Sequence, residues 1–404
     1  MRPEIQASAG GSRDQAIDII RGAGILMIGV DHLEFLCQKL AGPGFVDPFL
    51  TWQRIGWSSA AEFFVFFSGY LTGIVYLKTL QVHGPVMMWA RAAQRSWHIY
   101  VLNLLSLAAV LLLMTLPAFF SADINEATRI DALMGPQAAA AILGFLTLRF
   151  EPLYFEILNL YIVLLLLAPI AVLLIRVSPV LAASLSVAVW AAVQLDTAFG
   201  VVPLVRMTGS FNPFAWQLMF VLGMLGGTYG IFRKLRERWW HRSLLVTSGS
   251  LLAFALLIKI IDRSGWSVPL IGSFDMPGYN KPGLGSLQLV HFLVSVVFVM
   301  QLIPQRDAAV RSLPMRAVAG VGRRSLECFC MSTILVYVLS AILVKDGSFD
   351  PLPLLLAGAA IVIALCLFAP LVDWVEAKPW RKPGSAPAAQ IRKDDMPSVA
   401  RRAV

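Results

Sequence analysis

Long apolar runs dominate the chain, and short polar segments separate them. Windows such as VLNLLSLAAVLLLMTLPAFF (101–120) and LYIVLLLLAPIAVLLI (160–175) approach the roughly 20 apolar residues that a helix needs to cross a bilayer. The pattern therefore predicts an all-α, polytopic membrane helix bundle of about ten transmembrane helices. We place the spans near 17–39, 56–77, 96–119, 152–175, 179–196, 210–230, 243–261, 285–304, 324–344 and 352–374.

The composition agrees with this pattern. Of the 404 residues, 58% are hydrophobic and only 14% are charged, whereas a soluble protein carries about 25% charged residues. The run AAAAILGFLTLRF (138–150) is too short to cross alone and is predicted to be re-entrant or interfacial. Three regions follow: a cytoplasmic N-terminal segment (1–16), a transmembrane domain (17–374) and a basic tail (375–404). The tail should be disordered and lie against anionic lipid headgroups of the bilayer.

The distribution of basic residues predicts the orientation. If the N-terminus is cytoplasmic, the inner segments hold 23 Lys and Arg residues and the outer segments hold 9. Cytoplasmic loops normally carry such an excess, so both termini are predicted to be cytoplasmic. The topology accounts for the net charge of +9, and no folded basic module indicates a nucleic-acid partner.

The four cysteines, Cys37, Cys328, Cys330 and Cys366, all lie in or at the ends of apolar runs. They are typical of small packing residues and not of a disulfide framework. Cys328 and Cys330 have no second pair to complete a metal site, so we predict no metal and no bound cofactor.

Arg21, Asp31 and His32 are among the polar residues that interrupt the first apolar run, RGAGILMIGVDHLEF (21–35). His32 follows Arg21 by eleven positions, which on a helix is about 20° beyond three full turns and about 16 Å along the axis. The two side chains therefore share one face of the predicted helix. Polar groups inside a membrane usually face a cavity or one another, and this pair marks a functional site.

Further polar residues are expected near the outer half of the bundle. Glu62 lies on a stripe of small and polar residues, and His32, Glu62 and His291 are predicted to reach a similar depth. Asn212 and Gln217 begin their span from the same side. We expect a polar chamber there, with arginines at the inner entrance.

Simpler interpretations remain open for these residues. Glu62 and His32 could hold helices together, and His291 could be a hydrogen-bonded core histidine. Asp31 points about 100° away from His32 on the helix, so a packing or headgroup role is an equal alternative to catalysis. Arg91 and Arg95 could be ordinary positive-inside residues.

The R-x10-H spacing of Arg21 and His32 resembles the first-helix motif of the membrane acyltransferases of acyltransferase family 3. The OpgC-type branch is the most similar, and the resemblance covers nearly the whole membrane domain in the family's order. Where the branch has proline in an L-P-L-Y motif, this chain has Asn159. The matching segments are RDQAIDIIRGAGILMIGVDH (13–32), AAEFFVFFSGYLTGIVY (60–76), LNLYIVLLLLAP (158–169), FNPFAWQLMFVLG (211–223) and GRRSLECFC (322–330).

The resemblance implies an inner-membrane enzyme that transfers an acyl group, succinyl being one candidate, from cytoplasmic acyl-CoA to a hydroxyl of a periplasmic glycan such as an osmoregulated glucan. In this interpretation His32 is the general base, because histidine is suited to proton transfer near neutral pH. Glu62 would orient His32, with Asp31 as a further catalytic candidate. Seven residues are assigned to substrate binding: Arg21, Arg91, Arg95, Asn212, Trp216, Gln217 and His291.

Acyl-CoA is a co-substrate in this interpretation, and its anionic nucleotide end suits the basic inner segments. No G-x-S-x-G elbow is present, which favours direct transfer over a serine acyl-enzyme. The competing hypothesis is a transporter or flippase for a glycan or a small anionic metabolite. Such proteins usually contain inverted repeats, and we detect none. The sequence carries no signature of a particular oligomeric state.

The first prediction concerns orientation. Reporter fusions after Arg242 and after Val404 should both give a cytoplasmic signal, because basic residues concentrate in those segments. Paired alkaline phosphatase and green fluorescent protein fusions measure this, with a fusion after Gly200 as the periplasmic control. A periplasmic signal at Arg242 or Val404 would overturn the inside–outside assignment.

Overall fold

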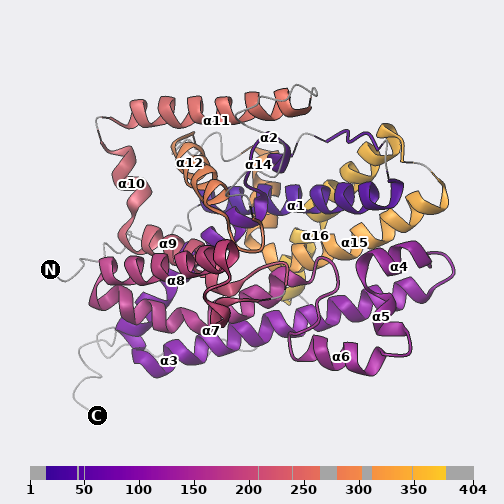
Figure 1. The fold of residues 1–404 in the computed structure, drawn as a ribbon, viewed down its shortest axis with the longest axis horizontal. Helices are drawn as coiled ribbons and strands as arrows, with labels where there is room; N and C mark the ends of the chain where they lie inside the picture. The colour runs from indigo at the N-terminus through magenta and orange to yellow at the C-terminus, as the bar shows by residue number, and fades with distance from the viewer. Residues whose placement is uncertain are drawn as a thin grey trace, which may run out of the picture.

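The computed structural model describes residues 15–42, 45–49, 51–207, 209–238, 240–263, 280–302, 312–347 and 349–378. These residues form helices and no strands (Figure 1), as the apolar pattern predicts. The helices are α1 (Gln15–Ala41), α2 (Trp52–Ile55), α3 (Ala60–Thr115), α4 (Ala122–Thr128), α5 (Asp131–Met134), α6 (Ala138–Leu146), α7 (Glu156–Val177), α8 (Pro179–Phe199), a 3-10 turn η1 (Pro203–Val205), α9 (Pro213–Tyr229), α10 (Ile231–Arg236), α11 (His241–Arg263), α12 (Ser286–Leu302), α14 (Leu313–Arg323), α15 (Ser325–Lys345) and α16 (Pro351–Ala377).

Among the described residues, six helices are long and apolar enough to cross a bilayer: α3, α7, α8, α11, α15 and α16. The chain is thus a multi-pass, all-α membrane protein, while the count of ten spans stays a prediction. Each predicted span nevertheless coincides with a helix, since α3 contains two of them and α1, α9 and α12 account for three more. The run 138–150 forms α6, whose nine residues extend only about 14 Å.

The α3 helix reverses its direction at Gly84. Gly84 has φ 79° and ψ 179°, which L side chains rarely adopt, and Pro85 follows it. Arg91 donates a hydrogen bond to Thr79 Oγ1 over 2.6 Å, although 12 residues of straight helix would separate them by about 18 Å. The predicted inner loop 78–95 is therefore helical on both sides of the reversal. The apolar pattern shows where a membrane span ends, but a helix can continue beyond its span.

The α1 and α15 helices lie side by side and run parallel. Arg21 contacts Ser325, Gly29 faces Ser332 and Cys37 contacts Ser340, so the two sequences keep a nearly constant offset. At one end of this pair, Arg324 forms an ion pair with Asp373 near the end of α16.

At the opposite end of the bundle, Lys39 donates to the carbonyl of Ala127, and Lys345 donates to the carbonyls of Pro117 and Ala118. The segments assigned to the inner and the outer side by their Lys and Arg content therefore lie at opposite ends of the helix pair. The start of α1 and the end of α16 lie at the same end. Which end faces the cytoplasm stays a prediction.

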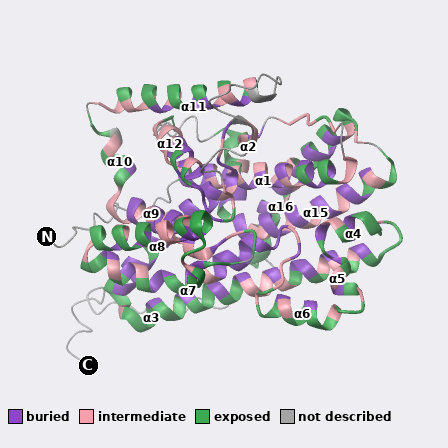
Figure 2. Ribbon diagram, in the orientation of Figure 1, coloured by how far each residue is buried: buried purple, intermediate pink, exposed green. Residues whose placement is uncertain are grey.

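Large apolar side chains cover the outside of the bundle, as a lipid environment requires. On α8, Val180 and Phe199 are 72% and 73% exposed, whereas Ser186 is buried. Figure 2 shows the buried residues concentrated along the central helices, with exposed residues on α8, α11 and the outer side of α3. This arrangement keeps polar side chains inside the protein and apolar side chains toward lipid.

Glycines bring neighbouring helices to backbone contact. A Cβ atom at Gly22 would collide with the carbonyl oxygen of Val318 in α14, and one at Gly322 would collide with the carbonyl of Asp18. Small residues allow this close approach in membrane bundles, where van der Waals packing drives helix association. The contact holds the start of α1 against α14 at Asp18 and Gly22, on either side of Arg21 in the sequence.

The second prediction tests this contact with a pair of variants on one helix. Gly22→Ala should destabilise the protein by about 1–3 kcal/mol, because its methyl group meets backbone that cannot rotate away. Gly24→Ala is the matched control, since no heavy atom lies within 4 Å of its Cβ position. Thermal unfolding of the detergent-solubilised variants, followed by size-exclusion chromatography, measures the difference. Equal midpoints for the two variants would contradict the close α1–α14 contact.

Candidate active site

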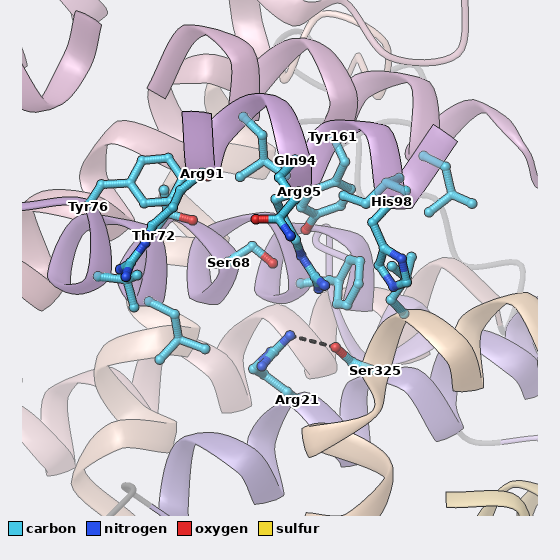
Figure 3. Close-up of a pocket in the computed structure, with 17 residues that line it drawn as sticks. Arg21, Ser68, Thr72, Tyr76, Arg91, Gln94, Arg95, His98, Tyr161 and Ser325 are labelled. Carbon is cyan, nitrogen blue, oxygen red and sulfur yellow. Dashed lines mark hydrogen bonds between the residues drawn. The ribbon is translucent and has the colours of Figure 1, made fainter. Parts of the chain in front are cut away.

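A cavity of about 540 Å³ opens between α1, both arms of α3, α7 and the start of α15 (Figure 3). Its volume falls in the range of small-molecule sites. Three arginines, Arg21, Arg91 and Arg95, and one histidine, His98, line it, and none of its lining residues is acidic. We call it the arginine cavity.

The reversal of α3 brings these basic residues together. Arg91, Arg95 and His98 follow an i, i+4, i+7 pattern, so they share one face of the second arm. In Figure 3, Arg95 and His98 extend from this arm toward Arg21 and Ser325 on the opposite wall. Arg21 donates a hydrogen bond of 2.5 Å to Ser325 Oγ, which fixes its guanidinium at the cavity. The structure thus unites the three arginines that the sequence proposes for substrate binding.

His32 packs among aromatic rings at the other end of α1. Its ring stacks on Tyr154 with centroids 3.9 Å apart and meets the edge of Phe329 at 6.1 Å. The Tyr154 hydroxyl donates a 2.6 Å hydrogen bond to the His32 backbone carbonyl. His32 Nδ1 is buried and has no hydrogen-bond partner among the described residues. An imidazole held by ring packing, with Nδ1 uncommitted among the described residues, is suited to accept a proton.

Tyr154 lies in the loop before α7, and hydrogen bonds of the preceding residue, Leu153, hold this loop in place. Leu153 donates its backbone N–H to the Thr128 carbonyl over 3.0 Å and accepts a 3.0 Å hydrogen bond from the Tyr337 hydroxyl. Tyr154 has φ 75°, a left-handed conformation that costs a residue with a side chain about 1–3 kcal/mol. Burial raises the pKa of Glu151 in the same loop, where Asn159 Nδ2 donates to its carboxylate.

Glu62 does not contact His32. Its carboxylate accepts hydrogen bonds from the backbone and the hydroxyl of Ser59, at 2.8 and 2.5 Å, and from Gln288. With Ser59, it forms the capping box that begins α3. Equal depth in the bilayer therefore does not place the two side chains together, and Glu62 lies instead in a separate pocket of about 40 Å³.

This Glu62 pocket, with room for about one water-sized group, also contains Lys259, Lys281 and Gln288. His291 lies beside it and shares a 2.7 Å hydrogen bond with Ser58, which lines the pocket. The expected polar chamber is thus small, and it groups Glu62 with His291.

Asn212, Trp216 and Gln217 make hydrogen bonds within the protein. Asn212 caps α9 by accepting from Phe214 N–H, and its backbone N–H donates to the Pro282 carbonyl at 2.9 Å. Trp216 Nε1 donates to the carbonyls of Lys281 and Pro282, both at 3.2 Å. The motif that suggested substrate contacts therefore anchors the segment that carries Lys281.

Gln217 joins α9 to α8 through Ser186, since it accepts from the Ser186 hydroxyl at 2.6 Å and donates to the Ser186 carbonyl at 2.8 Å. Asp31 is buried beside His32, and it interacts electrostatically with Lys281, as His32 does. Lys281 is thus a cation close to the candidate base.

Sequence reasoning missed Tyr154, Lys281, Ser325 and Phe329. Tyr154 resembles any other aromatic residue in an apolar sequence, so no pattern distinguishes it. Ser325 and Phe329 could have been found, because both lie in GRRSLECFC (322–330), one of the segments that resemble the OpgC-type branch.

The structure is that of an all-α, multi-pass membrane protein. Its α1 helix carries Arg21 at a cationic cavity and, further along, the packed His32. The family model described as OpgC protein matches residues 13–377, and the chain belongs to this family. Comparisons with curated proteins and with solved structures give no match.

Proposed function

We propose that this protein is a membrane O-acyltransferase that moves an acyl group from cytoplasmic acyl-CoA to a hydroxyl of a periplasmic glycan. The main observation behind this proposal is the arginine cavity, which is lined by three arginines and by no carboxylate. Membership of the OpgC protein family supports the acyl-transfer chemistry. The acyl group could be succinyl and the acceptor an osmoregulated glucan, as the branch's name suggests.

The charge of the cavity suits the donor. CoA carries phosphates, and arginine binds phosphate oxygens through paired N–H donors in a planar fork. Arg91 and Arg95 are exposed at the cavity, so they can meet a nucleotide from solution, while Arg21 lies deeper beside Ser325. The pantetheine arm is long and thin enough to extend from Arg21 toward His32, which lies about 16 Å further along α1.

The chemistry requires one base at the reacting end. The His32 imidazole accepts the proton of the acceptor hydroxyl as its oxygen attacks the thioester carbonyl carbon. The carbon–oxygen bond forms, the tetrahedral intermediate collapses and the carbon–sulfur bond breaks. The imidazolium then returns the proton to the CoA thiolate, which leaves an ester and free CoA.

The third prediction addresses the donor site. Arg21→Ala should weaken CoA binding at least tenfold, and Arg21→Lys should weaken it less, because lysine keeps the charge but loses the planar fork. Calorimetric titration of purified protein with CoA measures this, and Arg176→Ala, at an exposed position outside the cavity, is the control. Unchanged CoA affinity in Arg21→Ala would assign Arg21 to helix packing with Ser325.

The fourth prediction addresses catalysis. His32→Gln should lower acyl transfer by about 10²–10⁴-fold, because losing a general base typically costs this much. The assay uses radiolabelled acyl-CoA with a glucan acceptor in proteoliposomes, and His83→Gln, at an exposed position near the α3 reversal, should retain full activity. CoA binding by His32→Gln should stay normal, since His32 does not line the cavity.

The same assay separates the enzyme from a transporter. Only an acyltransferase leaves label covalently attached to the glucan, whereas a transporter moves label across the vesicle without attaching it. A folded His32→Gln variant with near-normal transfer would exclude His32 as the base.

A further inference from the structure

The arginine cavity ends before it reaches His32. Phe64 from α3 and Tyr161 from α7 line the cavity, with ring centroids 4.9 Å apart, and His32 is not among the lining residues. Phe64 and Tyr161 are only 6% and 3% exposed, so both rings are packed against their neighbours. They close one end of the cavity.

A third ring lies behind this closure. Phe329 of α15 stacks on Phe64 with centroids 6.3 Å apart and an interplanar angle of 17°. Its other neighbour is His32, whose ring it meets edge-on at 6.1 Å. Phe329 is 2% exposed. The ring contacts thus run from the cavity through Phe64 and Phe329 to the candidate base, and we call Phe64, Tyr161 and Phe329 the aromatic partition.

We propose that the aromatic partition limits the size of the acyl group that reaches His32, with Phe64 as the residue that sets the limit. This inference rests on the proposed donor site. A thioester bound at Arg21 reaches His32 only when the Phe64 ring rotates aside. Beyond Phe64, Phe329 and Tyr154 already pack against the imidazole, so the space for an acyl chain is short.

Phe64 lines the arginine cavity, whereas the nearby Phe66 on α3 does not. Phe66 packs against Phe232 and Phe292, at 5.9 and 5.4 Å, and does not line the cavity. Phe66→Ala therefore removes a ring of the same size from the same helix without opening the cavity, and it provides a matched control.

The fifth prediction uses unreactive donors, so that binding is measured apart from catalysis. Affinities of CoA and its S-ethyl, S-butyl and S-hexyl thioethers are compared by calorimetry. In the wild type, affinity should stop rising once the chain meets Phe64. In Phe64→Ala it should continue to rise, by roughly fourfold per methylene that enters the vacated space.

The Phe66→Ala control should keep the chain-length profile of the wild type. In the transfer assay, Phe64→Ala should raise the ratio of hexanoyl to acetyl transfer at least tenfold. Phe64→Leu, a smaller change that preserves apolar packing, should shift both readouts in the same direction, and it serves if the alanine variant fails to fold.

The outcomes separate this inference from the proposed function. If the wild type binds neither CoA nor its thioethers, the proposed donor site fails. If the wild type binds them and the folded Phe64 variants keep its chain-length profile, the donor site stands and the aromatic partition does not limit acyl size.

Discussion

The reversal of α3 at Gly84 is the constraint on which the candidate site depends. Because the two arms fold back on each other, Arg91 and Arg95 face the same cavity as Arg21, which comes from the first helix of the domain. Like charges that face one cavity repel, and the repulsion is larger where protein replaces water between them. No carboxylate lines the cavity to offset this. A bound polyanion relieves the repulsion, so the same geometry that costs stability in the empty protein favours a phosphorylated ligand.

Backbone contacts through glycine make this geometry rigid. The first arm of α3 meets α9 reciprocally: Gly69 lies against the Phe220 carbonyl and Gly223 against the Phe66 carbonyl. Each glycine meets backbone atoms of the other helix and not a side chain that could rotate aside. Sliding of one helix along the other would therefore bring backbone atoms into collision. Together with the Gly22–Val318 contact, they fix the walls of the arginine cavity before any ligand binds.

The helices, and the relations between side chains on the same helix, follow from the sequence for a physical reason. Apolar run length predicts the helices, and the eleven-residue spacing within one helix correctly relates Arg21 to His32, because helical geometry fixes positions along a single element. Relations between helices are different. Glu62 is predicted near His32 from its depth and from the polar stripe on its own helix, but neither feature fixes how one helix is rotated against another. The Glu62 carboxylate instead faces Ser59 and Gln288. Trp216 likewise satisfies its indole N–H on nearby backbone carbonyls, and no sequence pattern reveals which partner a buried donor will find.

A single rigid helix that carries both Arg21 and His32 has a consequence for the reaction. The two side chains lie about 16 Å apart along α1, so in the proposed reaction a donor held near Arg21 would present its thioester near His32 without movement of the helix itself. Among the described residues, the ring contacts between the arginine cavity and His32 run through Phe64 and Phe329. In the proposed enzyme these rings would have to rotate, whereas transporters rock whole helix bundles to expose a site to alternate sides. For the proposed acyltransferase, a fixed helix with movable rings would suit a donor whose nucleotide stays on the side of the membrane where it binds.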